Sequence, residues 1–173
     1  MNNLAPYEVV KDLFRTGDVI EYHGFDAPGP EIRFRTGYDV NHSELVVVMK
    51  SPYTGVMRRY THAALSPGFM PTYLSNTLAN YNGIAYWYPI RDEFVKDIPD
   101  IEARAFEYLG VGYDYTGLVK NLFGRTPIEK GLMFCSEACQ VCWDLVQEGV
   151  AWWPGELIEK GQRWQQPRYQ LIG

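Results

Sequence analysis

The chain has few of the features that assign a protein to a specialised class. Its only three cysteines all fall between residues 135 and 142, which excludes a disulfide framework and fits a reducing compartment. No run of Lys and Arg stands out and the net charge is −5, so a nucleic-acid-binding face is not expected. No apolar run approaches the length of a membrane span, and residues 1–8 lack the basic start and apolar core of a signal peptide. We therefore expect a cytoplasmic protein with no integral membrane segment and no nucleic-acid partner.

The remaining composition is that of a folded globular protein. Hydrophobic residues make up 46% of the 173 residues and charged residues 21%, which is enough apolar material for a real core. No repeat, low-complexity tract or linker divides the chain. We predict a single domain over residues 1–173.

The apolar pattern predicts a mixture of strands and helices. We expect strands at 19–22, 32–34, 42–49, 56–65, 84–90 and 168–172, and helices at 7–14, 92–109 and 135–149. The β-branched run in 42–49 indicates a strand buried on both faces. A turn at 51–55 would pair this strand with 56–65, so that His42 and His62 lie on adjacent strands. The sequence does not determine the register that decides whether the two rings face the same space.

Cys135 stands where a helix is expected to begin. Ser136 and Glu137 are favourable in a first helical turn, and the apolar spacing from residue 135 to residue 146 indicates one buried face. The unpaired backbone N–H groups of a helix start favour a thiolate and can also stabilise an oxyanion. The alternative is a small buried thiol, because free cysteine is among the most buried residue types.

The three cysteines also form a C-x3-C-x2-C motif, a spacing that can hold an iron–sulfur cluster. A continuous helix, however, arranges Cys135, Cys139 and Cys142 along one stripe and does not wrap them around a cluster. A second Cys or His group that could complete a zinc site is missing from the nearby sequence. We predict no metal and no organic cofactor, and we interpret Cys139 and Cys142 as core thiols.

Six short motifs span roughly residues 16–160 of the chain. They are T-G-D-V-I at 16–20, N-H-S-E-L-V-V at 41–47, H-A at 62–63, G-Y-D-Y at 112–115, C-S-E at 135–137 and W-P-G-E-L at 153–157. Together and in this order, they resemble the circularly permuted branch of the NlpC/P60 superfamily, the YiiX/YebB-like permuted papain-fold amidases and peptidases. Two motifs depart from that family's pattern. A Ser commonly precedes the His of the second motif, whereas Ser43 follows His42, and the third motif is commonly Glu-Ala where this chain has His62-Ala63.

The resemblance implies an α+β papain-like fold, with an antiparallel sheet or half-barrel packed against the Cys135 helix. It also implies Cys135 as nucleophile, His42 as base, His62 as the group that orients the His42 ring, and Tyr113 near the oxyanion. In that chemistry an imidazole generates the thiolate and later protonates the leaving group. A third polar group fixes the tautomer of the imidazole. The alternatives are a hydrogen-bonded core histidine at His42 and a core tyrosine at Tyr113.

The function implied is a thiol hydrolase that cleaves an amide in a small-molecule, peptide or lipid-linked substrate. A lipid acyltransferase or thioesterase of the lecithin:retinol type shares the order His then Cys, but has N-C-E-H-F at the nucleophile where this chain has F-C-S-E-A. A peptidoglycan endopeptidase would require export, for which we find no signal. A non-catalytic binding module on the same scaffold is the third alternative, and the intact Cys135 and His42 count against it.

Overall fold

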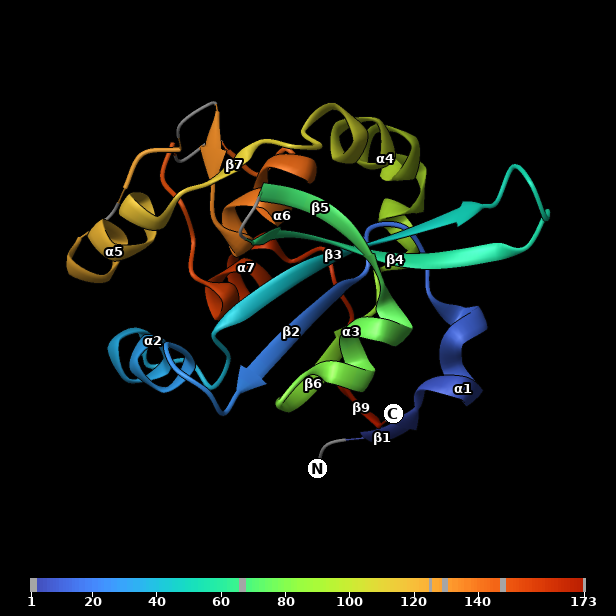
Figure 1. Cartoon of the computed structure of the whole chain (residues 1–173), viewed down its shortest axis with the longest axis horizontal. Helices are drawn as coiled ribbons and strands as arrows, with labels where there is room; N and C mark the ends of the chain where they lie inside the picture. Colours follow the sequence, from blue (N-terminus) through green and yellow to red (C-terminus); the bar gives the residue numbers. More distant parts are fainter. Residues whose placement is uncertain (1–2, 66–67, 125, 129–130, 147–148, 173) are drawn as a thin grey trace.

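The structure, a computed structural model, describes residues 3–65, 68–124, 126–128, 131–146 and 149–172. These residues form a seven-stranded sheet in the order β1-β9-β6-β2-β3-β4-β5, with helices on both faces, and a separate two-stranded sheet of β7 and β8 (Figure 1). All neighbouring pairs in the large sheet are antiparallel except β1 and β9, which are parallel. The two ends of the described chain thus lie side by side at one edge of the sheet.

The strands are β1 (Asn3–Pro6), β2 (Val19–Gly24), β3 (His42–Lys50), β4 (Met57–Leu65), β5 (Gly68–Tyr73), β6 (Gly83–Tyr88), β7 (Gly112–Tyr113), β8 (Leu132–Met133) and β9 (Tyr169–Ile172). The helices are α1 (Tyr7–Val10), η1 (Lys11–Leu13), α2 (Gly29–Thr36), α3 (Leu74–Asn80), η2 (Asp92–Asp97), α4 (Ile98–Glu107), α5 (Tyr115–Phe123), α6 (Cys135–Cys142) and α7 (Pro154–Gly161).

The central strand β3 explains why the sheet is covered on both sides. Leu45, Val46 and Val47 are all fully buried, so the predicted burial of this strand on both faces is confirmed. Successive side chains of a strand point to opposite faces. One face carries Leu45 and Val47 against α4, α6 and α7, and the other carries Val46 against the segment around α1 and η1 and against α3.

Helix α6 packs on the first of these faces. Ala138, Cys139 and Cys142 are fully buried in a core that also contains Ile101 and Leu157, from α4 and α7. Cys139 and Cys142 are therefore core thiols in the structure. The packing fixes α6 against β3, with its first residue, Cys135, near the end of the strand where His42 lies.

Two local predictions are wrong. Residues 32–34 lie in helix α2, which has proline at its start and ends at Gly37 in the left-handed region (φ 76°). Three alternating residues are too short a signal to outweigh a proline suited to a first helical turn and a glycine suited to a helix end. The Cys135 helix ends at Cys142, well before residue 149, because Asp144 adopts φ 56° and the chain turns away.

The predicted fold class is confirmed. The chain is a mixed α+β protein in which a largely antiparallel sheet packs against the helix that begins at Cys135. Among the described residues, every helix is too short or too polar to cross a membrane.

Candidate active site

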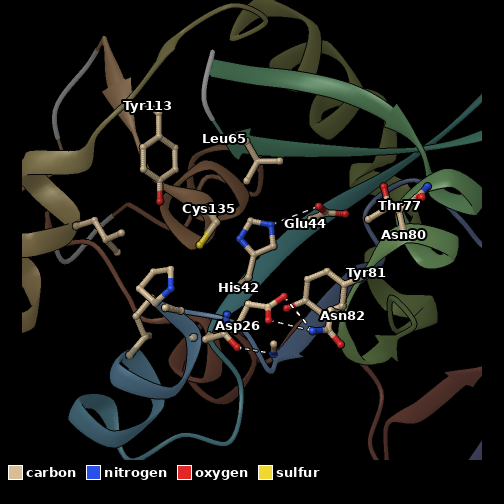
Figure 2. A pocket seen from close by; sticks show the side chains of 17 residues that line it. Asp26, His42, Glu44, Leu65, Thr77, Asn80, Tyr81, Asn82, Tyr113 and Cys135 are labelled. Carbon is tan, nitrogen blue, oxygen red and sulfur yellow. Dashed lines mark hydrogen bonds and ion pairs between the residues drawn. The ribbon is translucent and has the colours of Figure 1, made fainter.

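Cys135 is the first residue of α6 and its thiol lies at the helix start, 4% exposed (Figure 2). Two contacts hold this turn. The backbone N–H of Phe134 donates to Glu137 Oε2 at 3.2 Å, and Ser136 Oγ donates to the carbonyl oxygen of Trp152 at 2.6 Å. All four of these residues are buried, so packing as well as hydrogen bonds fixes the turn that carries the sulfur.

His42 is the first residue of β3, and its ring lies between the thiol and a carboxylate. Nε2 is 3.3 Å from Glu44 Oε1, while the other ring nitrogen, Nδ1, points toward the sulfur of Cys135 (Figure 2). His42 and Glu44 are two apart on one strand, so their side chains share a face. The Tyr22 hydroxyl donates to Glu44 Oε2 at 2.7 Å, and Tyr22 is the residue paired with His42 on β2. The carboxylate is thus held on both oxygens.

The electrostatics favour an ion pair between Cys135 and His42. Burial opposes charge on the ring, but the Cys135 thiolate and Glu44 outweigh it and raise the pKa of His42 to about 10. Burial also opposes the thiolate, yet the pKa of Cys135 is lowered by His42 and by the backbone N–H groups of Ser43 and Ser136. Both shifts favour the thiolate and imidazolium over the uncharged pair.

For the other two thiols, burial is the dominant influence, and the charge of Arg104 opposes it only in part at Cys142. Burial raises the pKa of Cys142 to about 12 and that of Cys139 well above its ordinary value. Both stay protonated at neutral pH. The three cysteines of one helix thus differ sharply in nucleophilic character.

His62 does not lie where the sequence-based prediction placed it. It pairs with Leu45 across β3 and β4, and directly opposed residues share a face, so it lies on the face opposite to that of Glu44. Its ring is fully buried between Phe69 and Phe106, at centroid distances of 5.5 and 6.0 Å. Neither ring nitrogen has a well-formed hydrogen bond to a described residue, and burial lowers the pKa of His62 to about 4, opposed only by a backbone group of Ala105. The place beside His42 is taken by Glu44.

Tyr113 does lie at the thiol. It is in β7, whose parallel pairing with β8 sets Tyr113 beside Met133, two residues before Cys135. Its hydroxyl points toward Cys135 (Figure 2). Burial, reinforced by the negative charge of Cys135, raises the pKa of Tyr113 far above its ordinary value, so the hydroxyl keeps its proton. Three of the four predicted site residues, Cys135, His42 and Tyr113, are therefore together, and His62 is apart.

The three residues line a cavity of about 510 Å³. Its walls come from the end of β2, the following loop and α2, and from α3, α5 and the residue before β6. A volume of this size accommodates a small-molecule or extended peptide substrate. Cys135 reaches the cavity from the start of its helix.

Two acidic residues at the site were missed by the sequence reasoning. Glu44 could have been found, because a carboxylate two residues after a strand histidine shares its face. Glu21 on β2 gave no such signal. It is fully buried, its Oε1 accepts from Ser43 Oγ at 2.9 Å, and its Oε2 has no hydrogen-bond partner among the described residues. Burial raises the pKa of Glu21 well above its ordinary value, and the Cys135 charge adds to this.

No protein-family model and no curated protein matches the chain. Among solved structures, it is similar to the crystal structure of the metalloprotein yiiX from Escherichia coli O157:H7 (DUF1105), with a TM-score of 0.55 and 19% sequence identity. The match covers 79% of this chain and 66% of that one, just under two thirds of its length. Within the described part of this chain, no group of three or more His, Cys, Asp and Glu residues could hold a metal ion. The similarity therefore shows that the chain has a yiiX-like fold.

Proposed function

We propose that this protein is a thiol hydrolase of the permuted papain type that cleaves an amide through a covalent acyl-enzyme. The observation that carries the proposal is the row Cys135, His42 and Glu44, in which one ring nitrogen faces the sulfur and the other faces a carboxylate. Such a row both generates the thiolate and fixes the tautomer of the base. The similarity to yiiX supports the scaffold and leaves the reaction to be tested.

In the first half-reaction, the Cys135 thiolate attacks the amide carbonyl. A carbon–sulfur bond forms and the carbonyl π electrons move to oxygen, where the protonated Tyr113 hydroxyl is placed to donate a hydrogen bond. The intermediate then collapses, the carbon–nitrogen bond breaks, and the leaving amine takes the proton from His42 Nδ1. The products are a thioester on Cys135 and a neutral imidazole.

In the second half-reaction, water attacks the thioester and gives its proton to His42. The carbon–sulfur bond breaks, the carboxylic acid leaves, and the thiolate–imidazolium pair is restored. Glu44 accepts the Nε2 hydrogen bond throughout and stabilises the charged ring. His62 has no role in this scheme, because Glu44 occupies the orienting position.

Acylation by p-nitrophenyl acetate tests the proposal without knowledge of the natural substrate. We expect a burst of p-nitrophenolate and an acetyl group on Cys135, located by tandem mass spectrometry. Cys135→Ser should abolish the burst, because oxygen is far less ionised than sulfur. His42→Ala should be nearly as severe, since nucleophile and base act as one unit.

The matched control is Cys139→Ala, which removes a thiol from the same helix. It should acylate at the wild-type rate and lose only stability, of order 1 kcal/mol. An undiminished burst in Cys135→Ser, or acetylation spread over all three cysteines, would contradict the proposal. An undiminished burst would mean that any chemistry lies elsewhere in the chain, whereas unselective acetylation would leave a binding module on this scaffold as the better interpretation.

A further inference from the structure

The cavity has two chemically different sides, and Cys135 and His42 lie between them (Figure 2). One side is polar and is formed by residues at α3 and in the loops that follow β2 and precede β6. The other is apolar and is formed by α2, α5 and β7. The polar residues are Asp26, Thr77, Asn80, Tyr81 and Asn82, and the apolar ones include Pro28, Ile32, Tyr113 and Leu118.

The charges on the cavity wall are predominantly negative. Asp26 and Glu44 line it, and no Lys or Arg does so among the described residues. The guanidinium of Arg33 is nearby but occupied, since it donates to the carbonyl oxygen of Gly24 and to Asn41 Oδ1. These acceptors are neutral and leave the positive charge of Arg33 in place, but Arg33 does not line the cavity. On the wall itself the thiolate and imidazolium cancel each other, and the two carboxylates remain.

The start of α2 does little to offset these charges, although a helix N-terminus usually attracts anions. Pro28 and Pro30 have no N–H to offer. The N–H of Gly29 is already donated to the backbone carbonyl of Asp26, at 2.9 Å. The usual anion-binding groups of a helix start are therefore mostly absent or in use.

Asp26 is oriented but not neutralised. Asn82 Nδ2 lies 3.0 Å from each of its carboxylate oxygens and donates to them from one side. Asp26 makes no ion pair with any described residue and is exposed to the cavity. A carboxylate offers about four acceptor positions, so most remain for a donor from a ligand. A neutral amide fixes the position of the carboxylate and leaves its charge.

We infer that the substrate is an amide that carries a protonated amino group, which binds Asp26 on the polar side while an apolar part packs against Tyr113 and Leu118. This inference rests on the proposed function and adds the substrate class. A cation in this cavity gains Coulombic attraction from both carboxylates, whereas an anion is repelled by both. Specificity for charge would then come mainly from Asp26, since Glu44 is engaged by His42 and Tyr22.

Charged thiol reagents measure the potential at Cys135 directly. Three methanethiosulfonates are compared: the cationic 2-(trimethylammonium)ethyl and the anionic 2-sulfonatoethyl reagents, which are similar in size, and the smaller neutral methyl reagent. In each case the thiolate attacks the thiosulfonate, a mixed disulfide forms and methanesulfinate leaves. Modification of Cys135 is followed by tandem mass spectrometry. We expect the cationic reagent to react faster than the anionic one.

Asp26→Asn should lower the ratio of cationic to anionic rates by about three- to tenfold at low salt, with each rate taken relative to that of the neutral reagent on the same variant. Glu31→Gln is the matched control, because it removes the same charge from an exposed position on α2 that does not line the cavity. Its ratio should equal that of the wild type. The neutral reagent also reports whether Asp26→Asn has distorted the site.

Two outcomes overturn the inference, and they differ. If Cys135 reacts readily but the ratio is the same in Asp26→Asn, the substrate class is wrong while the proposed function stands. If Cys135 reacts with none of the three reagents, the thiol is not activated and the proposed function fails, together with the inference that rests on it.

Discussion

Substitution of Glu44 by Gln separates the charge of the orienting residue from its shape. Gln keeps an oxygen for His42 Nε2 but removes the negative charge 3.3 Å away. The side chains of His42 and Glu44 are only 15% and 5% exposed, so water screens this charge weakly. A hydrogen bond to a charged group contributes about 1.5–3 kcal/mol, and loss of roughly half of it corresponds to about one pKa unit.

We therefore expect Glu44→Gln to lower the pKa of His42 from about 10 by about one unit. The thiolate loses part of its stabilisation when the imidazolium does, so the pKa of Cys135 should rise. The chain has three histidines, which makes a nitrogen-15 NMR titration of labelled His rings a direct measurement. Assignments follow from the loss of one signal in each histidine variant.

His62→Leu is the control, because the sequence placed His62 in the same role. Its removal should leave the titration of His42 unchanged, since His62 lies on the other face of the sheet. The reasoning is refuted if Glu44→Gln leaves the pKa of His42 in place, or if His62→Leu shifts it by a similar amount. The second result would restore His62 as the orienting residue.

Three further predictions concern the buried groups around the site. Iodoacetamide at neutral pH should alkylate Cys135 well before Cys139 and Cys142, whose pKa values are raised by burial, and equal labelling in the folded protein would contradict an activated Cys135. The folded-state pKa of His62, about 4, lies below its ordinary 6.5, so the unfolded chain binds the extra proton between these values and the free energy of unfolding falls as pH falls through that window. His62→Leu removes this loss. The free energy of unfolding of the variant minus that of the wild type, measured by urea unfolding, should be about 3 kcal/mol greater at pH 4 than at pH 7. The same difference at both pH values would count against a buried neutral ring. The pKa of Glu21 is raised above its ordinary 4.5, so its stabilising contribution is present at low pH and is lost as pH rises. Glu21→Gln stays neutral and should gain about 1 kcal/mol or more over wild type between pH 5 and pH 8 by thermal unfolding, and a loss over this range would show that the ionised form is the stable one.

The sequence alone determined the parts of this protein that depend on a few neighbouring residues. The apolar run of β3 indicated a strand buried on both faces, and the first-turn residues after Phe134 indicated that a helix begins at Cys135. Both signals act within one or two turns or a single strand, because propensity and hydrophobic period are local properties. The same patterns indicated a mixture of strands and helices, and the family resemblance implied the α+β fold class. At 32–34 the local signal was too short, and the proline and glycine that bound α2 decided the structure.

Only the tertiary structure decided which side chains meet. The choice between Glu44 and His62 depends on register: pairing of Leu45 with His62 puts the histidine on the far face, and a shift of one residue would have reversed this. Tyr113 reaches the thiol through a strand pairing with Met133, twenty residues along the chain. On the polar side of the cavity, the hydrogen bond from Asn82 to Asp26 joins two loops that are 56 residues apart in the sequence. Such contacts depend on how the whole chain packs, and a short stretch of sequence does not specify that packing.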